Sequence, residues 1–139
     1  MIKDLVKDEA ALSAPCAPAT ADDAAVAADL VETLAATEGA ACLAANQIGA
    51  QVAVIAYLDD ADAAHVMYNP KVLLALGAFK TVEGCLTRDG ETKVTRYDKV
   101  KVNYDELVDG ALKSRTRDFT GWEAQMIQHM VDHCKGKYI

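Results

Sequence analysis

Apolar residues recur at helical spacing in the first third of the chain. Within residues 21–37 an apolar stripe repeats every three or four positions and acidic residues occupy the opposite side, which predicts an amphipathic helix. The stripe consists of Ala27, Leu30, Val31 and Leu34. Gly39 is well placed to end this helix, and residues 1–20 are predicted to form an irregular, turn-rich lead-in.

A second helix is predicted at the other end of the chain. Thr120 and Glu123 have the Thr-x-x-Glu spacing of a capping box, so this helix should begin near Gly121 and run to about Lys135. Gly136 is its expected C-terminal stop.

Between the two helices the period changes to that of β-strands. Val52–Tyr57 is a short apolar run, typical of a strand buried on both faces. Further strands are predicted at His65–Tyr68, Val72–Leu74, Lys93–Tyr97, Lys99–Tyr104 and Ala111–Phe119, the first two being separated by Asn69-Pro70. The order of helix, several strands and helix predicts an α+β domain with a mostly antiparallel sheet, a single domain over residues 1–139.

Composition narrows the class of protein. The chain has 139 residues, of which 52% are hydrophobic and 25% charged, as expected for a folded globular domain. The net charge of −7 and the scattered basic residues argue against nucleic-acid binding. We find no secretory segment and no apolar run near the roughly 18 residues that would span a membrane, so we expect a cytoplasmic protein that does not bind membranes.

Four cysteines are spaced irregularly and form no Cys-x-x-Cys pair, which favours free thiols or metal ligands over a disulfide framework. Cys16 and Cys134 have no evident partners. His129 and His133 lie four residues apart on the second predicted helix, so both imidazoles share one face and could bind one metal ion. Such a pair in an arbitrary helix is more often a surface or packing feature.

Cys85 is the candidate for a third ligand, because it lies in a glycine-containing segment between strand-like runs. A thiolate with two imidazoles suits a divalent zinc or iron ion and leaves a fourth position open for water and substrate. The alternative, a buried structural thiol, is the commoner role of an isolated cysteine.

Three segments, in order and at suitable distances, resemble the three motifs of the peptide deformylase family. They are residues 39–49 (GAACLAANQIG), 83–87 (EGCLT) and 128–133 (QHMVDH). The resemblance extends to Tyr68-Asn69-Pro70, to the entry of the last helix at residues 119–122 and to the N-terminal helix, and so covers essentially the whole chain.

The resemblance implies a fold, a site and a reaction. Cys85, His129 and His133 would bind one divalent metal, Fe(II) as the usual ion of the family, with Zn(II) or Ni(II) as substitutes. The Gln47 side-chain amide and the Leu86 backbone N–H would form an oxyanion hole. The family removes the formyl group from the N-terminal methionine of new polypeptides with a metal-activated water, so the expected partner is a formyl-methionyl peptide.

The third motif departs from the family pattern at Met130. The family has His-Glu-x-x-His, in which the glutamate moves the proton, and a thioether cannot do so. We see no replacement, because Asp132 projects differently and is expected to be a supporting residue, as is Glu83, and Glu123 is expected to cap the helix. The alternative is that Met130 is only a packing residue in a chain that resembles the family by chance. This alternative agrees less well with the matching residues on either side.

Two functions therefore stay open. One is a deformylase whose activity is impaired by Met130, and the other is a non-catalytic homologue that binds metal and peptide. A structural metal domain acting through a partner is a third, weaker hypothesis.

The first motif departs at Cys42, where family members carry a glycine that lets the substrate approach. A side chain here narrows the channel. We hypothesise that Cys42 supplies a fourth metal ligand or pairs oxidatively with Cys85, either of which would close the site. A small core residue is an equally good interpretation.

Four other residues have less specific expectations. We expect Trp122 to anchor the last helix to the sheet and His65 to be a surface or packing residue. Met126 and Ile127 belong either to the core or to a pocket for methionine, which the sequence does not separate.

Overall fold

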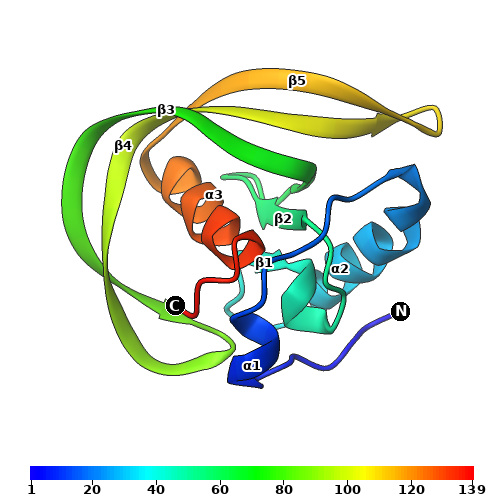
Figure 1. Ribbon diagram of the computed structural model, residues 1–139, viewed down its shortest axis with the longest axis horizontal. Coiled ribbons are helices and arrows are strands. Elements are labelled where there is room, and N and C mark those ends of the chain that lie inside the picture. The colour runs from blue at the N-terminus through cyan, green and yellow to red at the C-terminus, as the bar shows by residue number, and fades with distance from the viewer.

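Two helices and a five-stranded antiparallel sheet form the body of the protein (Figure 1). The computed structural model describes residues 1–139. The sheet has the order β1-β2-β3-β4-β5, and every neighbouring pair is antiparallel, which confirms the predicted fold class. The elements are α1 (Glu9–Leu12), the 3-10 turn η1 (Ala21–Asp23), α2 (Ala24–Ala36), β1 (Cys42–Ala44), the 3-10 turn η2 (Ala45–Ile48), β2 (Val54–Leu58), β3 (Ala64–Cys85), β4 (Arg88–Val108), β5 (Ala111–Thr120) and α3 (Gly121–Cys134).

Strand β2 lies between two hydrophobic cores and contributes side chains to both. Its side chains alternate between the two faces of the sheet: Val54 and Ala56 pack in a cluster with α2, and Ile55 and Tyr57 pack in a cluster with α3. A strand that is buried on both faces needs an unbroken apolar run, which is the pattern that predicted it. The helix stripe on α2 is also confirmed, with Leu30 and Leu34 at most 1% exposed.

Strands β3 and β4 are longer than their sequence patterns predicted, and together they curl around α3 (Figure 1). The predicted break at Asn69-Pro70 is wrong, because this dipeptide forms a register shift within one strand. Asn69 has a φ of 53°, and its side chain bonds both the N–H and the carbonyl of Ala19. These bonds satisfy the backbone groups of Ala19 and join the N-terminal lead-in to β3.

The start of α3 differs from its prediction. The Thr120 side chain makes no capping hydrogen bond, so the predicted box with Glu123 is wrong, although the helix begins at Gly121 as expected. Gly121 has a φ of 60°, outside the helical region, and this changes the path of the chain into the first turn. Trp122 does not anchor the helix, since it is 59% exposed, whereas Ile127 is fully buried and Met126 is 3% exposed. No helix of the protein combines the length and apolar character required to cross a bilayer.

The N-terminal lead-in packs against the end of α3 and contains the short helix α1, which the sequence did not predict. The Cys16 N–H donates to the Cys134 carbonyl at 2.9 Å, and a hydrogen bond with the Cys134 thiol lowers the pKa of Cys16. The expectation that these cysteines have no partners is therefore wrong, although both are free thiols. Gly136 lies at this junction with a φ of 78°.

We predict that Gly136→Ala destabilises the protein more than Gly39→Ala. Both glycines have a φ of 78°, so each alanine should cost about 1–2 kcal/mol for its backbone conformation. A Cβ at Gly136 would also lie 2.6 Å from the Ala14 carbonyl carbon, while one at Gly39 would meet nothing within 4 Å. In urea unfolding, the free energy of unfolding of Gly136→Ala should be lower than that of Gly39→Ala by about 1–3 kcal/mol. Equal losses would contradict the close packing of this junction.

Candidate metal centre

Cys85, His129 and His133 come together between the end of β3 and the middle of α3. Their possible ligand atoms all lie within 4.8 Å of one another. The histidines share one helix face because they are four residues apart, and their ring centroids are 4.9 Å apart. The curl of β3 carries Cys85 to this face, and the Gln128 side chain fixes α3 to β4 by bonding the Tyr97 N–H at 2.9 Å and its carbonyl at 2.8 Å.

The three residues fit a divalent metal ion. The Cys85 Sγ lies 3.5 Å from His133 Nε2. Tetrahedral zinc, with Zn–S near 2.3 Å and Zn–N near 2.0–2.1 Å, implies a sulfur–nitrogen separation of about 3.5 Å. A thiolate with two imidazoles is also a donor set that zinc and iron accept. The structure thus has the geometry and the chemistry of a single-metal site.

The Cys85 side chain is suited to act as a thiolate. Burial alone raises the pKa of its thiol, but interactions with His129, His133 and Thr87 outweigh burial and lower the pKa to about 5. A group with this pKa is ionised at neutral pH, which is the state in which sulfur binds metals.

His129 is oriented by a buried carboxylate. Burial raises the pKa of Glu83, but its contacts with His129, Arg96 and Gln125 lower it to about 2, so Glu83 is ionised and can only accept hydrogen bonds. His129 Nδ1 lies 2.7 Å from Glu83 Oε1 and donates its hydrogen to it, so Nε2 is the ring atom that remains to face a metal. Burial lowers the pKa of His129, but Cys85 and Glu83 raise it to about 9, so a metal ion would have to displace the proton on Nε2. A carboxylate behind a metal-binding histidine commonly fixes its tautomer and its orientation.

Glu83 is in turn held by Arg96, which bridges the sheet to α3. The Arg96 guanidinium contacts Glu83 at 2.7 Å and Asp132 at 2.6 Å, and the arginine is 4% exposed. Gln125 Nε2 donates to the same Glu83 carboxylate at 2.8 Å. Glu83 and Asp132 have the supporting positions that the sequence suggested.

The sequence analysis missed Arg96. A weak signal was available, because Arg96 has the same even-numbered parity as Val100 and Val102, which are fully buried on the inner face of β4. An arginine at an inward position needs buried partners, but the strand pattern does not say which ones they are.

His133 is held differently from His129. Its Nδ1 atom is buried and has no hydrogen-bond partner, so packing rather than a carboxylate orients this ring. The backbone at this point is fixed by Asn46, whose side-chain amide donates to the His133 carbonyl at 3.0 Å. Asn46 lies in the first motif and is fully buried, a positioning role that the sequence analysis did not assign.

Gln47 and Leu86 lie on the same side of the centre. Gln47 Oε1 accepts the Ala44 N–H at 2.8 Å, which turns Nε2 toward the Thr87 hydroxyl at 3.0 Å and the Cys85 sulfur at 3.4 Å. Gln47 and Leu86 both line a cavity of about 460 Å³ together with Cys85 and His129. The amide donor therefore faces the space beside the three candidate ligands.

Met130 is the residue at which the third motif departs from the family pattern. It is 2% exposed, lines the same cavity and also packs in the core cluster of α3. The nearby carboxylates are engaged, because Glu83 binds Arg96 and His129 while Asp132 binds Arg96 and Lys137. No unpaired carboxylate lines this cavity.

Cys42 lines the cavity but is not part of the metal-ligand group. It is a free thiol, so neither the fourth-ligand arrangement nor the disulfide with Cys85 is present in the structure. Burial, with smaller effects of Cys85 and Glu83, raises the pKa of Cys42 to about 12, which keeps the thiol neutral. It packs against the α3 core cluster, as the interpretation of a small core residue predicted.

Comparisons with known proteins agree with this geometry. The family model for polypeptide deformylases matches residues 2–139. A peptide deformylase from Clostridium beijerinckii is 35% identical over 137 residues, which cover 98% of each chain. The crystal structure of a class I type b peptide deformylase from Acinetobacter baumannii superposes with a TM-score of 0.84 at 27% identity, covering 99% of this chain and 96% of that one. A Met-Ala-Ser-bound structure of the same enzyme gives a TM-score of 0.82 at 26% identity, covering 98% and 96%.

The fold and the centre define a protein of the single-metal hydrolase class, in which one ion is bound between a strand and a helix. The chain belongs to the peptide deformylase family.

We predict that Glu83→Gln weakens metal binding. The amide removes the negative charge that holds His129, and loss of such a partner typically costs about 10- to 100-fold in affinity. A competition titration of Zn(II) against a chromogenic chelator measures the effect. Glu91→Gln is the matched control, because it removes the same charge from an exposed residue of β4. Equal affinities of the two variants would contradict the role given to Glu83.

We also predict that Arg96→Met strongly destabilises the fold. The substitution leaves the buried Glu83 and the partly buried Asp132 without their shared cation, which should lower the free energy of unfolding by about 3–5 kcal/mol. Arg115→Met is the control, since the Arg115–Glu106 pair is 3.2 Å long and both side chains are 48% exposed. That variant should lose less than about 1 kcal/mol in the same urea titration. Similar losses of unfolding free energy in the two variants would show that the Arg96 ion pairs stabilise the fold no more than an exposed pair does.

Proposed function

We propose that Cys85, His129 and His133 bind one divalent metal ion, Fe(II) or Zn(II), with Ni(II) as an alternative. The donor set, the 3.5 Å separation of Cys85 Sγ and His133 Nε2, and the Glu83 carboxylate behind His129 support this assignment. When bound, the ion supplies Lewis-acid activation of a water molecule and of a substrate carbonyl.

The substrate of this site is an N-terminal formyl-methionyl peptide. Membership of the family supports the reaction, which is hydrolysis of the formyl amide. Gln47 Nε2 and the Leu86 N–H donate to the oxygen that becomes negatively charged as the carbonyl is attacked. The bond from Ala44 to Gln47 Oε1 supports this role, because it fixes the amide with its donor toward the cavity.

The cavity is suited to a methionine side chain. Its lining is mainly apolar and includes Met126, Met130 and Trp122, which is exposed at the mouth. A volume of about 460 Å³ holds a methionyl residue with its formyl group. The Met-Ala-Ser bound to the A. baumannii enzyme supports a peptide ligand of this kind.

Turnover is impaired because Met130 cannot accept or return a proton. Positioned general acid–base catalysis is worth about 10²- to 10⁴-fold, and every carboxylate near the centre is bound to another group. The second candidate function, a non-catalytic homologue that binds metal and peptide, is favoured by the same residue. The two functions share the metal and the peptide and differ only in chemical turnover.

We predict that Met130→Glu increases deformylation by at least about 100-fold, because it provides a carboxylate beside the metal. Release of formate from formyl-Met-Ala-Ser by the Ni(II)- or Fe(II)-loaded protein measures the reaction. Met130→Gln is the control, since it has nearly the same shape as glutamate and no basic group. Its activity should stay at the level of the unsubstituted protein.

The results separate the two functions. Slow formate release by the unsubstituted protein supports an impaired deformylase, whereas activity confined to Met130→Glu supports the non-catalytic homologue. Turnover by the unsubstituted protein equal to that of Met130→Glu would contradict impairment. Calorimetric titration with Met-Ala-Ser should show peptide binding in all three proteins, and no binding would contradict the peptide site.

A further inference from the structure

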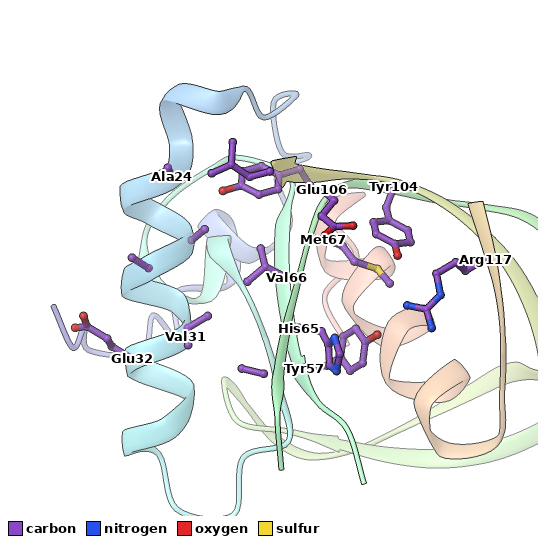
Figure 2. Close-up of a pocket in the computed structure, with 15 residues that line it drawn as sticks. Ala24, Val31, Glu32, Tyr57, His65, Val66, Met67, Tyr104, Glu106 and Arg117 are labelled. Carbon is purple, nitrogen blue, oxygen red and sulfur yellow. The ribbon is translucent and has the colours of Figure 1, made fainter. Parts of the chain in front are cut away.

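The protein has a second and larger cavity, which is lined by Tyr57 of β2. Cys42, the residue of β1 that pairs with Tyr57, lines the metal cavity instead. In Figure 2 the lining residues of the second cavity lie on both sides of β2 and β3, with the α2 side chains on one side and Tyr57, Tyr104 and Arg117 on the other. Its volume is about 670 Å³, its lining is mostly apolar, and it shares no residue with the metal cavity. It therefore plays no part in the proposed deformylation.

The cavity exists because β3 and β4 separate. Their pairing ends at Tyr68 and Asp105. Beyond this point residues 64–67 pair only with β2, and residues 106–108 pair only with β5. The two strands diverge, and the gap between them is not filled by side chains. Size and apolar lining are those of sites that bind small molecules.

Three polar side chains meet in this cavity. Tyr57, Tyr104 and Arg117 point toward one another in Figure 2. The tyrosines are 1% and 5% exposed. The Tyr57 hydroxyl makes no hydrogen bond to the chain and is not among the sealed polar atoms, so it faces the cavity. An interaction with Tyr104 raises the pKa of Arg117, in agreement with their proximity.

Arg117 is the cation of the cavity that has no carboxylate partner. The two lining carboxylates are paired with other groups, Glu32 with the N-terminal amine and Glu106 with Arg115. Asp59, behind the lining, pairs with His65 at 2.7 Å, and the His65 ring stacks on Tyr57. Glu123 acts on Arg117 from the first turn of α3 but forms no ion pair with it. Arg117 is exposed and its guanidinium lies 5.2 Å from the centre of the Phe119 ring, so it borders the cavity from the solvent side and is available to an anion.

We propose that this cavity binds a small amphipathic carboxylate, whose head group contacts Arg117 and the hydroxyls of Tyr57 and Tyr104. A guanidinium with two phenol donors matches the acceptor oxygens of a carboxylate. The apolar chain of the ligand lies against Met67, at the gap where β3 and β4 separate. Octanoate has this chemistry and a size that the cavity accommodates.

The test is an NMR titration of the ¹⁵N-labelled full chain with sodium octanoate. We expect octanoate to bind at least 10-fold more tightly than either 1-octanol, which lacks the charge, or acetate, which lacks the chain. Shifted amides should belong to residues around the second cavity. Shifts concentrated at residues 84–86 would overturn the proposal, because they would indicate a carboxylate bound at the metal centre.

Variants make the test specific. Arg117→Met should weaken octanoate binding at least 10-fold and leave 1-octanol binding unchanged. Lys101→Met is the matched control, because it removes the same charge from an exposed position of β4, and its octanoate affinity should not change. Tyr57→Phe removes one oxygen from the interior, so it tests the site even if Arg117→Met fails to fold, and we expect several-fold weaker binding. Octanoate affinity that is the same in Tyr57→Phe and the unsubstituted protein, or equal losses in Arg117→Met and Lys101→Met, would overturn the proposal.

Discussion

Arg96 joins the curled hairpin of β3 and β4 to the helix that carries both histidines, through ion pairs with Glu83 at 2.7 Å and with Asp132 at 2.6 Å. Because Arg96 and Glu83 are buried, each of these two charges depends on its ion pairs in place of water. The same Glu83 carboxylate accepts a hydrogen bond from His129 Nδ1 and so orients the ring. One cluster therefore fixes the curl of the hairpin, the position of α3 and the direction of one metal-binding ring. A change in any member acts on both the fold and the site.

Strand β2 has a similar double role for the rest of the molecule. Its alternate side chains belong to the two cores, and it separates the metal cavity from the larger cavity beside α2. Cys42 and Tyr57 are direct cross-strand neighbours, and each lines a different cavity. Strand β2 contributes to the boundary between the two cavities, and the metal cavity is completed by the segments before β1 and after β3.

Metal binding and proton transfer are separate properties of this site. The ligands are fixed by the helix spacing, by the end of β3 and by Glu83, none of which involves residue 130. Met130 instead packs in the core cluster at 2% exposure, where an apolar side chain stabilises α3. Position 130 therefore contributes to the packing of α3, while the grouping of Cys85, His129 and His133 is retained.

The sequence by itself determined α2, the doubly buried β2 and the extent of α3, because local periodicity encodes burial. It also indicated the family through three motifs and predicted Cys85, His129 and His133 as candidate ligands of one metal ion. It failed at Asn69-Pro70, where β3 continues through a register shift from its pairing with β2 to its pairing with β4, and at Trp122, whose burial depends on what α3 faces. Only the tertiary structure placed Arg96 between Glu83 and Asp132, because these residues come from different elements that meet only in the folded protein. It also decided the cavity at Arg117, because this cavity depends on where β3 and β4 stop pairing.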